Sequence, residues 1–169
     1  MALNRRSPHR SFVSYIDKSR IYYEAQGYKQ PYTWAVYGHA PFTLPAKPLS
    51  QCKVGFATTA SRVDFGEGVE SLMRERDCYF ASCDPPPERL FTGHLFWDKE
   101  ATHTGDVESF LPLKGLSEYV RMGRVAAVSP RFYGVPTDYS QGRTIKKHAP
   151  QILKWAREDG VDAMLLSAL

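Results

Sequence analysis

The last third of the chain alternates between amphipathic stretches and short apolar stretches, and this alternation constrains the fold more than any other feature. The stretches 111–123 and 149–160 carry apolar residues at helical spacing, and each ends at a glycine. Each is followed by a short apolar run, at 124–129 and at 161–169, of the kind that forms β-strands. Helices and strands in this order predict an α/β domain with a parallel sheet.

The final run, VDAMLLSAL, has consecutive apolar residues and little alternation between apolar and polar ones. Strands that are covered on both faces by helices have this pattern. We therefore expect 161–169 to be a central strand of an open, mainly parallel, Rossmann-like sheet with flanking helices. Because a central strand closes the sequence, we also expect this sheet to be incomplete.

The first part of the chain has a different character. Apolar and aromatic residues at near-helical spacing predict a helix over 11–27, and four prolines among aromatic residues predict an extended arm over 28–48. We therefore divide the chain into an N-terminal helix with its arm, 1–48, and an α/β domain, 49–169. Further strands of that domain are expected at 54–57, 79–81 and 90–97.

Composition excludes several classes of protein. The 169 residues include no apolar run of about 18 residues, so no membrane-spanning segment is expected. The net charge is +4, but lysines and arginines are scattered along the chain, so we expect no nucleic-acid partner. An odd number of cysteines without a secretory signal predicts reduced thiols and a cytoplasmic location.

Two polar segments that follow expected strands carry the candidate substrate-binding residues. Thr58 and Thr59 begin a polar turn after one strand, and the loop 129–144, which contains Arg131 and Tyr133, follows another. Ligands of open α/β sheets bind beyond the carboxyl ends of the strands. Arg131 could pair with a substrate carboxylate, and Tyr133 could donate a hydrogen bond. The alternative is a plain turn, a surface salt bridge of Arg131 and a tyrosine packed on the sheet.

No motif in the chain predicts a metal, a nucleotide or a catalytic residue. There is no glycine-rich phosphate loop, and four residues separate Cys78 from Cys83, which is not the usual spacing for zinc or for a redox pair. A metal site could still be drawn with His94 and His103. His94 with Asp98 could act as an acid/base pair, although the pattern favours a hydrogen-bonded structural histidine. Either cysteine could be the base of a racemase or lyase.

Six segments, which together span nearly all of the chain, carry a family resemblance as an ordered set. They read SYIDKSRIYYEAQGYKQPYTWA, PLSQCKVGFATTA, LFTGHLFWD, SFLPLKGLSEYVRMGRV, SPRFYGVPTDYSQGRT and APQILKWAREDGVDAMLL. Through these segments the chain resembles the selenoprotein B component of the glycine/sarcosine/betaine and D-proline reductases, and in particular their reductase-like homologues.

The resemblance implies a redox centre that this sequence lacks. In the family, a segment like EDGVDAMLL leads within a few residues into a selenocysteine, or a cysteine in its place, with another cysteine close behind. That centre would begin just after Leu169. Selenocysteine is encoded by UGA, so we hypothesise that the chain is the N-terminal part of a selenoprotein whose reading frame was closed at this codon.

The resemblance also implies an activity, a cofactor and partners. The full-length protein would be an oxidoreductase that cleaves a small, amino-acid-like substrate reductively. Its partners would be a thiol or thioredoxin-type reductant or other reductase subunits, and in the better-known reductases one of these subunits carries a pyruvoyl group. The present chain would hold no cofactor and would have no reductase activity by itself. The alternative is a non-catalytic α/β binding or assembly protein that uses the arm 28–48 as its partner surface.

Overall fold

The computed structural model describes residues 15–29, 38–39, 43–62, 77–93, 100–137 and 140–169. The chain consists of two compact units, Met1–Pro41 and Phe42–Leu169, whereas the sequence predicts the boundary at the end of the proline-rich arm, near residue 48. No helix in the described ranges is both long enough and apolar enough to cross a membrane.

The first unit contains helix α1, Tyr15–Ala25, which confirms the described part of the predicted helix. It ends as the sequence predicts, because Gly27 adopts a positive φ of 84° and the N–H of Tyr28 returns to the carbonyl of Tyr23. Most of the predicted arm lies outside the described residues.

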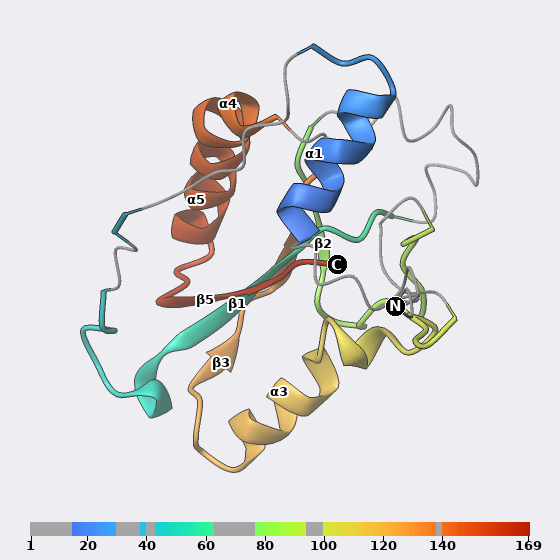
Figure 1. Ribbon diagram of the computed structural model, residues 1–169. Helices are drawn as coiled ribbons and strands as arrows, with labels where there is room; N and C mark the ends of the chain where they lie inside the picture. The colour runs from blue at the N-terminus through green and yellow to red at the C-terminus, as the bar shows by residue number, and fades with distance from the viewer. Residues whose placement is uncertain (1–14, 30–37, 40–42, 63–76, 94–99, 138–139) are drawn as a thin grey trace, which may run out of the picture. The chain divides into compact units, whose positions relative to one another are not determined.

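The second unit is built on one open sheet of five strands, of which all but one are parallel (Figure 1). Strands β3 and β4 pair with the start and the end of one side of β1, and β5 pairs along its other side. Strand β2 extends the sheet antiparallel to β4. The prediction of an open, mainly parallel α/β sheet is thus confirmed. The strands are β1 Lys53–Thr58, β2 Tyr79–Ser82, β3 Ala127–Val128, β4 Arg131–Gly134 and β5 Ala163–Ser167.

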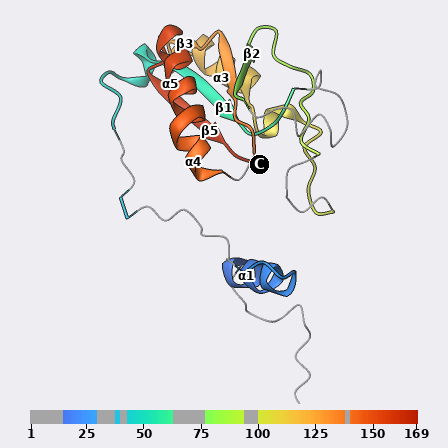
Figure 2. The ribbon, with the colours of Figure 1, turned by 90° about the horizontal axis from the view of Figure 1, so that it is seen from above.

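Helices cover both faces of this sheet, with α3 and α5 on opposite sides of β1 (Figures 1 and 2). Helix α3 confirms the amphipathic stretch 111–123, and Gly123 ends it with a φ of 69°. Helix α5 follows α4 and a π-helical turn without interruption. The helical elements are α3 Leu113–Arg121, α4 Gln141–Arg143, the π turn η5 Thr144–His148, α5 Ala149–Glu158 and the 3-10 turns η2 Leu49–Gln51 and η4 Val107–Ser109.

The side chains of alternate residues of β1 pack into two separate cores, one on each face of the sheet, because successive side chains of a strand point to opposite faces. Phe56 packs on the α3 side, in a cluster with Leu113 and Phe132. Ala57 packs on the α5 side against Tyr133 and Ala156. Burial on both faces explains why β1 is almost continuously apolar.

The structure corrects three of the strand and loop predictions. The expected loop 129–144 holds strand β4 near its start and the helix that begins at Gln141 near its end. In the expected strand 90–97, the described part contains one isolated bridge, from Phe91 to Ser61, and the rest lies outside the described residues. Strand β5, expected in the centre, lies at the edge of the described sheet.

Candidate functional site

The candidate site lies at the carboxyl ends of β1 and β5. The connectivity of the sheet changes direction at β1, because the chain runs from β1 to β3 and β4 on one side and later to β5 on the other. Open α/β sheets bind ligands in the crevice outside the carboxyl ends of the strands at such a point. In this chain that end of the sheet is bordered by the turn 58–61 and by residues 167–169, the end of β5 and the two residues after it.

Hydrogen bonds hold the turn 58–61 in place. The hydroxyl oxygen of Thr58 accepts from the N–H of Ala60 at 3.2 Å, and that of Thr59 accepts from the N–H of Leu169 at 2.9 Å. The phenol of Tyr79 donates to the carbonyl of Ala60 at 2.5 Å. Thr58 is buried and Thr59 is half-buried, so of the two predicted threonines only Thr59 reaches the surface at this end of the sheet.

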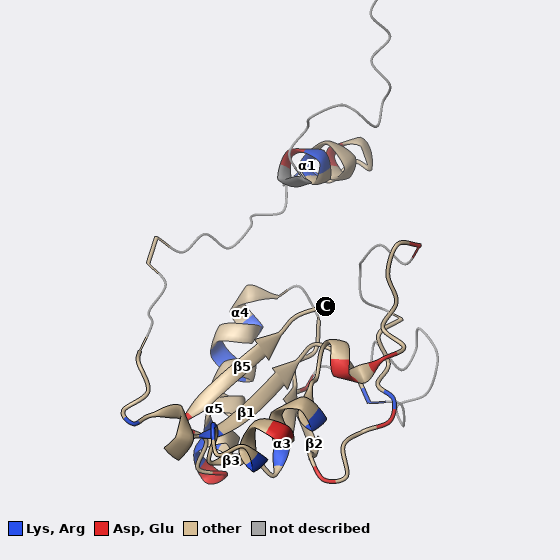
Figure 3. Cartoon of the chain, turned by 90° about the horizontal axis from the view of Figure 1, so that it is seen from below, with Lys and Arg blue, Asp and Glu red and all other residues tan. Residues whose placement is uncertain are grey.

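The N-terminus of a helix faces the same end of the sheet. Residues 141–158 form one continuous helix whose α4 end lies nearest the carboxyl end of β5 (Figure 3). Ser140 caps this helix, since its hydroxyl accepts from the N–H of Arg143 at 3.3 Å. In the connection from β4, the hydroxyl of Thr137 is buried and has no hydrogen-bond partner among the described residues. A helix N-terminus with nearby hydroxyls favours an anionic group such as a carboxylate.

Sequence reasoning missed this helix terminus. The proline at position 150 suggested a start there, because proline is favoured in the first turn of a helix. The sequence did contain one signal for a helix start at this point. Ser140 is a good N-capping residue, and its hydroxyl can accept a hydrogen bond from the backbone N–H three residues later.

Arg131 and Tyr133, the other two predicted residues, lie in β4, and their polar groups contact Asp159, beside the start of β1. The guanidinium of Arg131 donates to both carboxylate oxygens of Asp159, with Nε to Oδ2 at 2.8 Å and Nη2 to Oδ1 at 2.8 Å. The phenol of Tyr133 donates to Oδ2 of Asp159 at 2.6 Å. Arg131 also lies 4.3 Å above the ring of Phe80. The structure therefore shows the salt bridge that was the alternative reading of Arg131, and it does not bring the four predicted residues together.

This Arg131–Asp159–Tyr133 cluster is suited to holding structure and poorly suited to proton transfer. Burial and the hydrogen bond to Asp159 raise the pKa of Tyr133 to about 12, so its phenol stays protonated. Burial alone would raise the pKa of Asp159, but the hydrogen bonds from Arg131 and Tyr133 outweigh it and hold that pKa below its ordinary value. The cluster joins the end of α5 to β4 as a permanent ion pair.

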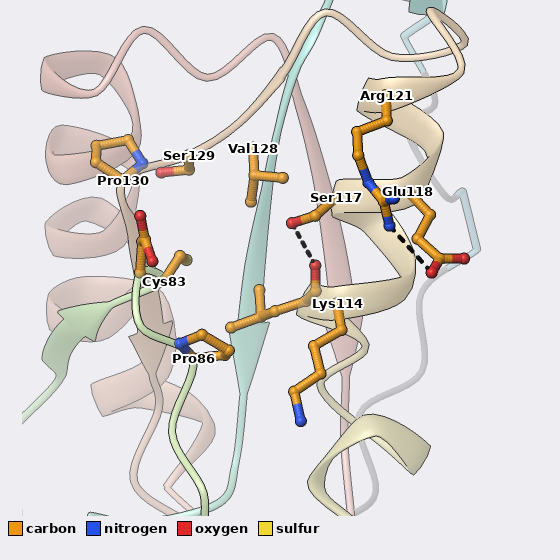
Figure 4. Close-up of a pocket in the computed structure, with 11 residues that line it drawn as sticks. Cys83, Pro86, Lys114, Ser117, Glu118, Arg121, Val128, Ser129 and Pro130 are labelled. Carbon is orange, nitrogen blue, oxygen red and sulfur yellow. Dashed lines mark hydrogen bonds and ion pairs between the residues drawn. The ribbon is translucent and has the colours of Figure 1, made fainter.

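A separate cavity of about 510 Å³ lies between α3 and the segment 128–130 (Figure 4). Its polar groups are largely engaged within their own helix: Ser117 donates to the carbonyl of Leu113 at 2.9 Å, and Arg121 pairs with Glu118 at 3.1 Å. Such groups have little capacity left to fix a ligand.

Cys83 lines the same cavity, and its environment suppresses its reactivity. Burial, with a smaller contribution from the negative charge of Asp159, raises the pKa of the Cys83 thiol to about 12. The thiolate is the reactive form, so almost none is present at neutral pH. A racemase or lyase that uses Cys83 as its base is therefore disfavoured.

We expect Cys83 to react with iodoacetamide at pH 8 at least about 100-fold more slowly in the folded chain than in the urea-unfolded chain. Mass spectrometry of the alkylated peptides measures this rate for each cysteine separately, so the unfolded chain serves as the reference. Alkylation of Cys83 at a rate within tenfold of the unfolded value would contradict the expected protonation.

Two further candidates can be placed only in part. Among the described residues, no group of three or more histidine, cysteine, aspartate or glutamate side chains is arranged to hold a metal ion. His94 and Asp98, the candidate acid/base pair, lie outside the described residues. No disulfide joins any of the three cysteines, all of which are described.

Comparison with known proteins gives no relative. No protein-family model, no curated protein and no solved structure matches the chain.

Proposed function

We propose that this chain forms the N-terminal portion of a selenocysteine- or cysteine-dependent reductase. The full-length protein resembles the B component of the glycine/sarcosine/betaine and D-proline reductases and cleaves a small, amino-acid-like substrate. The observation that carries the proposal lies at the carboxyl ends of the paired strands β1 and β5, where the N–H of Leu169 donates to Thr59. A redox residue that followed Leu169 would therefore begin beside this turn, at the end of a parallel sheet where ligands bind.

The segments that carry the resemblance support this choice of site. PLSQCKVGFATTA covers β1 and the turn 58–61, and APQILKWAREDGVDAMLL covers α5 and most of β5. SPRFYGVPTDYSQGRT covers β4 and the helix N-terminus at Gln141. Three of the six segments thus lie in the elements that border this end of the sheet and in the strands that support them.

The chemistry is a two-electron reductive cleavage. A selenolate or thiolate supplied by the redox residue displaces the amine of the substrate, and the carbon–nitrogen bonding pair leaves with the amine, which takes a proton from water. A thiol then takes the selenium or sulfur from the substrate carbon, which gains a proton, and a dithiol of the thioredoxin type reduces the resulting bond and becomes a disulfide.

The described residues of this chain would bind and orient the substrate. The N-terminus of the helix that begins at Gln141 suits the substrate carboxylate, and Thr59 would border the reacting end. Thr58 would stabilise the turn through its hydrogen bond from Ala60. Arg131 and Tyr133 would stabilise the sheet through their hydrogen bonds to Asp159. The protein would work in the cytoplasm, with a thiol or thioredoxin-type reductant as its partner and, as in the better-known reductases, a subunit that carries a pyruvoyl group.

Reading the nucleotides that follow the Leu169 codon tests the proposal directly. We expect a UGA codon, then in-frame codons for two residues and a cysteine, and then a further α/β coding sequence. A different stop codon, or no coding sequence beyond it, would overturn the reductase proposal and favour the binding protein.

An activity measurement provides the second test. The product extended through the UGA codon, with selenocysteine in place, should release ammonia or an amine from glycine, sarcosine or betaine, or open the ring of D-proline to 5-aminopentanoate, in the presence of dithiothreitol and its partner subunits. The 169-residue chain under the same conditions should release none.

The second candidate function is the non-catalytic binding or assembly protein. It is favoured by one observation, the exposure of two leucines that line the same groove between β5 and α5: Leu166 is 79% exposed and Leu153 is 50% exposed. Exposed apolar residues that adjoin one another mark surfaces that bind other proteins.

A further inference from the structure

The outer edge of β5 has no partner among the described residues. Strand β5 pairs with β1 through five residues, and no other described strand pairs with it. An edge of this kind presents a row of backbone N–H and C=O groups that can accept a further strand. Natural edge strands are usually protected by charges, prolines or bulges, but β5, with the sequence AMLLS, has neither a charge nor a proline (Figure 3).

The opposite edge of the sheet shows that protection. Strand β2 has four residues and leads directly into Asp84 and three consecutive prolines, 85–87. Prolines have no N–H to donate, and a charge beside an edge strand disfavours the addition of another. The two edges of the described sheet therefore differ in their protection, and only the edge of β5 lacks a charge or proline that would disfavour pairing with a further strand.

Both faces of β5 are also apolar and accessible. Leu165 is exposed on the α3 side, and Leu166 on the α5 side. Between β5 and α5 lies a groove of about 450 Å³ lined mainly by apolar side chains, among them Met164 and Ile152. Leu153 of α5, which is 50% exposed, also lines this groove. An occupant must therefore be an extended segment, uncharged and apolar on both faces.

We propose that the occupant is β5 of a second copy of this chain, paired antiparallel across a two-fold axis at Leu165. Strand β5 is itself extended, uncharged and apolar on both faces, which are the properties that an occupant of this edge must have. In this register Leu165 faces its copy, and Met164 faces Leu166 of the second copy on the α5 side. A two-fold axis perpendicular to the sheet keeps the α5 helices of both copies on the same face, so the two grooves adjoin.

Charge and symmetry favour this occupant. In the same register Ala163 faces Ser167, and Asp162 faces the uncharged Ala168, so no like charges are opposed across the interface. Asp162 is already paired, with the ammonium of Lys47 at 2.9 Å. An isologous dimer also closes on itself, which limits further strand addition at the same edge. The dimer is inferred for the 169-residue chain and concerns the side of β5, whereas the reductase proposal concerns its carboxyl end. In the longer reductase, a strand that followed Leu169 would compete for the same edge of β5.

The molar mass of the 169-residue chain in solution tests the dimer. Light scattering after size exclusion should give twice the mass of one chain. The Leu166→Lys variant should raise the dissociation constant by about 100-fold or more, because each dimer loses two buried leucines and gains two charges. The Met122→Lys control places the same charge on a residue that is 67% exposed beyond α3 and should leave the mass unchanged.

Cross-linking tests the register. The Leu165→Cys variant should form a disulfide-linked dimer on mild oxidation, because the two side chains face each other across the axis, whereas Met122→Cys and the unmodified chain should not. A monomer, assemblies larger than a dimer, a dimer that Leu166→Lys leaves intact, or equal cross-linking at positions 165 and 122 would each overturn the proposal.

Discussion

The Asp159→Ala variant is expected to lose about 3 kcal/mol of the free energy of unfolding. The Asp159 side chain is 9% exposed and receives hydrogen bonds from Arg131 and Tyr133. Without it, the Arg131 guanidinium, itself only 22% exposed, keeps its charge and loses its main partner. Removing one member of a largely buried ion pair costs more than the pair contributes, because the remaining charge stays poorly solvated.

Glu158 provides a matched control. It is the preceding carboxylate, 48% exposed, and it lies 3.4 Å from the same guanidinium. Exposed ion pairs of this length contribute little, so Glu158→Ala should change the free energy of unfolding by less than about 0.5 kcal/mol. Urea unfolding followed by circular dichroism measures both variants. Equal losses for the two variants would show that the burial of Asp159 is not what makes it important.

The same carboxylate should make stability depend on pH. The pKa of Asp159 is lower in the folded chain than its ordinary value near 4, so the ionised carboxylate favours the folded state above that pH. This contribution is lost as the pH falls through the folded pKa. The stability difference between the native chain and Asp159→Asn should be constant above about pH 5 and should shrink below about pH 4. A difference that does not change with pH would contradict the role of the charge.

Local patterns in the sequence were sufficient to predict most of the helices and strands of the second unit. Amphipathic spacing identified α3 and most of α5, and the apolar runs identified β1 and β5, because such periods depend only on neighbouring residues. Strand β4 was missed because its four residues lie between Pro130 and Pro136 and are stabilised by pairing with β1 and β2. Such distant pairing leaves no period in the local sequence.

The start of the helix 141–158 was missed for a different reason. Pro150 cannot donate a backbone hydrogen bond, so it normally marks the first turn of a helix. Here the π turn 144–148 immediately precedes it, and the wider hydrogen-bonding pattern of such a turn accommodates a residue that lacks an N–H. Nothing in the residue types of this turn signals the wider pattern.

The candidate site was predicted only in part. The position of Thr58 and Thr59 after an apolar strand was enough to place them at the carboxyl end of β1. Arg131 had two possible partners on sequence grounds, a substrate or a protein carboxylate. The choice depends on Asp159, which lies 28 residues further on and reaches Arg131 only because α5 packs across the sheet. Sequence spacing does not contain that information.

Gly134→Ala is expected to lose about 3 kcal/mol of the free energy of unfolding, or about 6 to 12 °C in melting temperature. Gly134 lies opposite Tyr79 in the antiparallel pair of β2 and β4, and the tyrosine ring covers the glycine. A Cβ atom at position 134 would lie 1.8 Å from Cε1 of Tyr79 and 2.2 Å from its Cζ. No atoms of folded proteins approach so closely without bonding, so one of the two strands must move.

Tyr79 cannot easily move aside. It is buried, its phenol donates to the carbonyl of Ala60, and its ring packs edge-on against Phe132 at 6.2 Å between centroids. Displacing the ring would also release the turn that borders the candidate site. We therefore expect Gly134→Ala to disturb the turn 58–61 as well as the sheet.

Gly142→Ala is the matched control, because an added Cβ there meets no atom within 4 Å. It lies in α4, where alanine is favoured over glycine, so this variant should gain up to about 1 kcal/mol. A compensating variant locates the clash: replacing Tyr79 with alanine should cost less in the Gly134→Ala background than in the native chain, since the ring no longer opposes a methyl group. Thermal unfolding of the native chain, of the Gly134→Ala and Tyr79→Ala variants and of the double variant measures this coupling. Additive losses would show that the ring and position 134 do not meet.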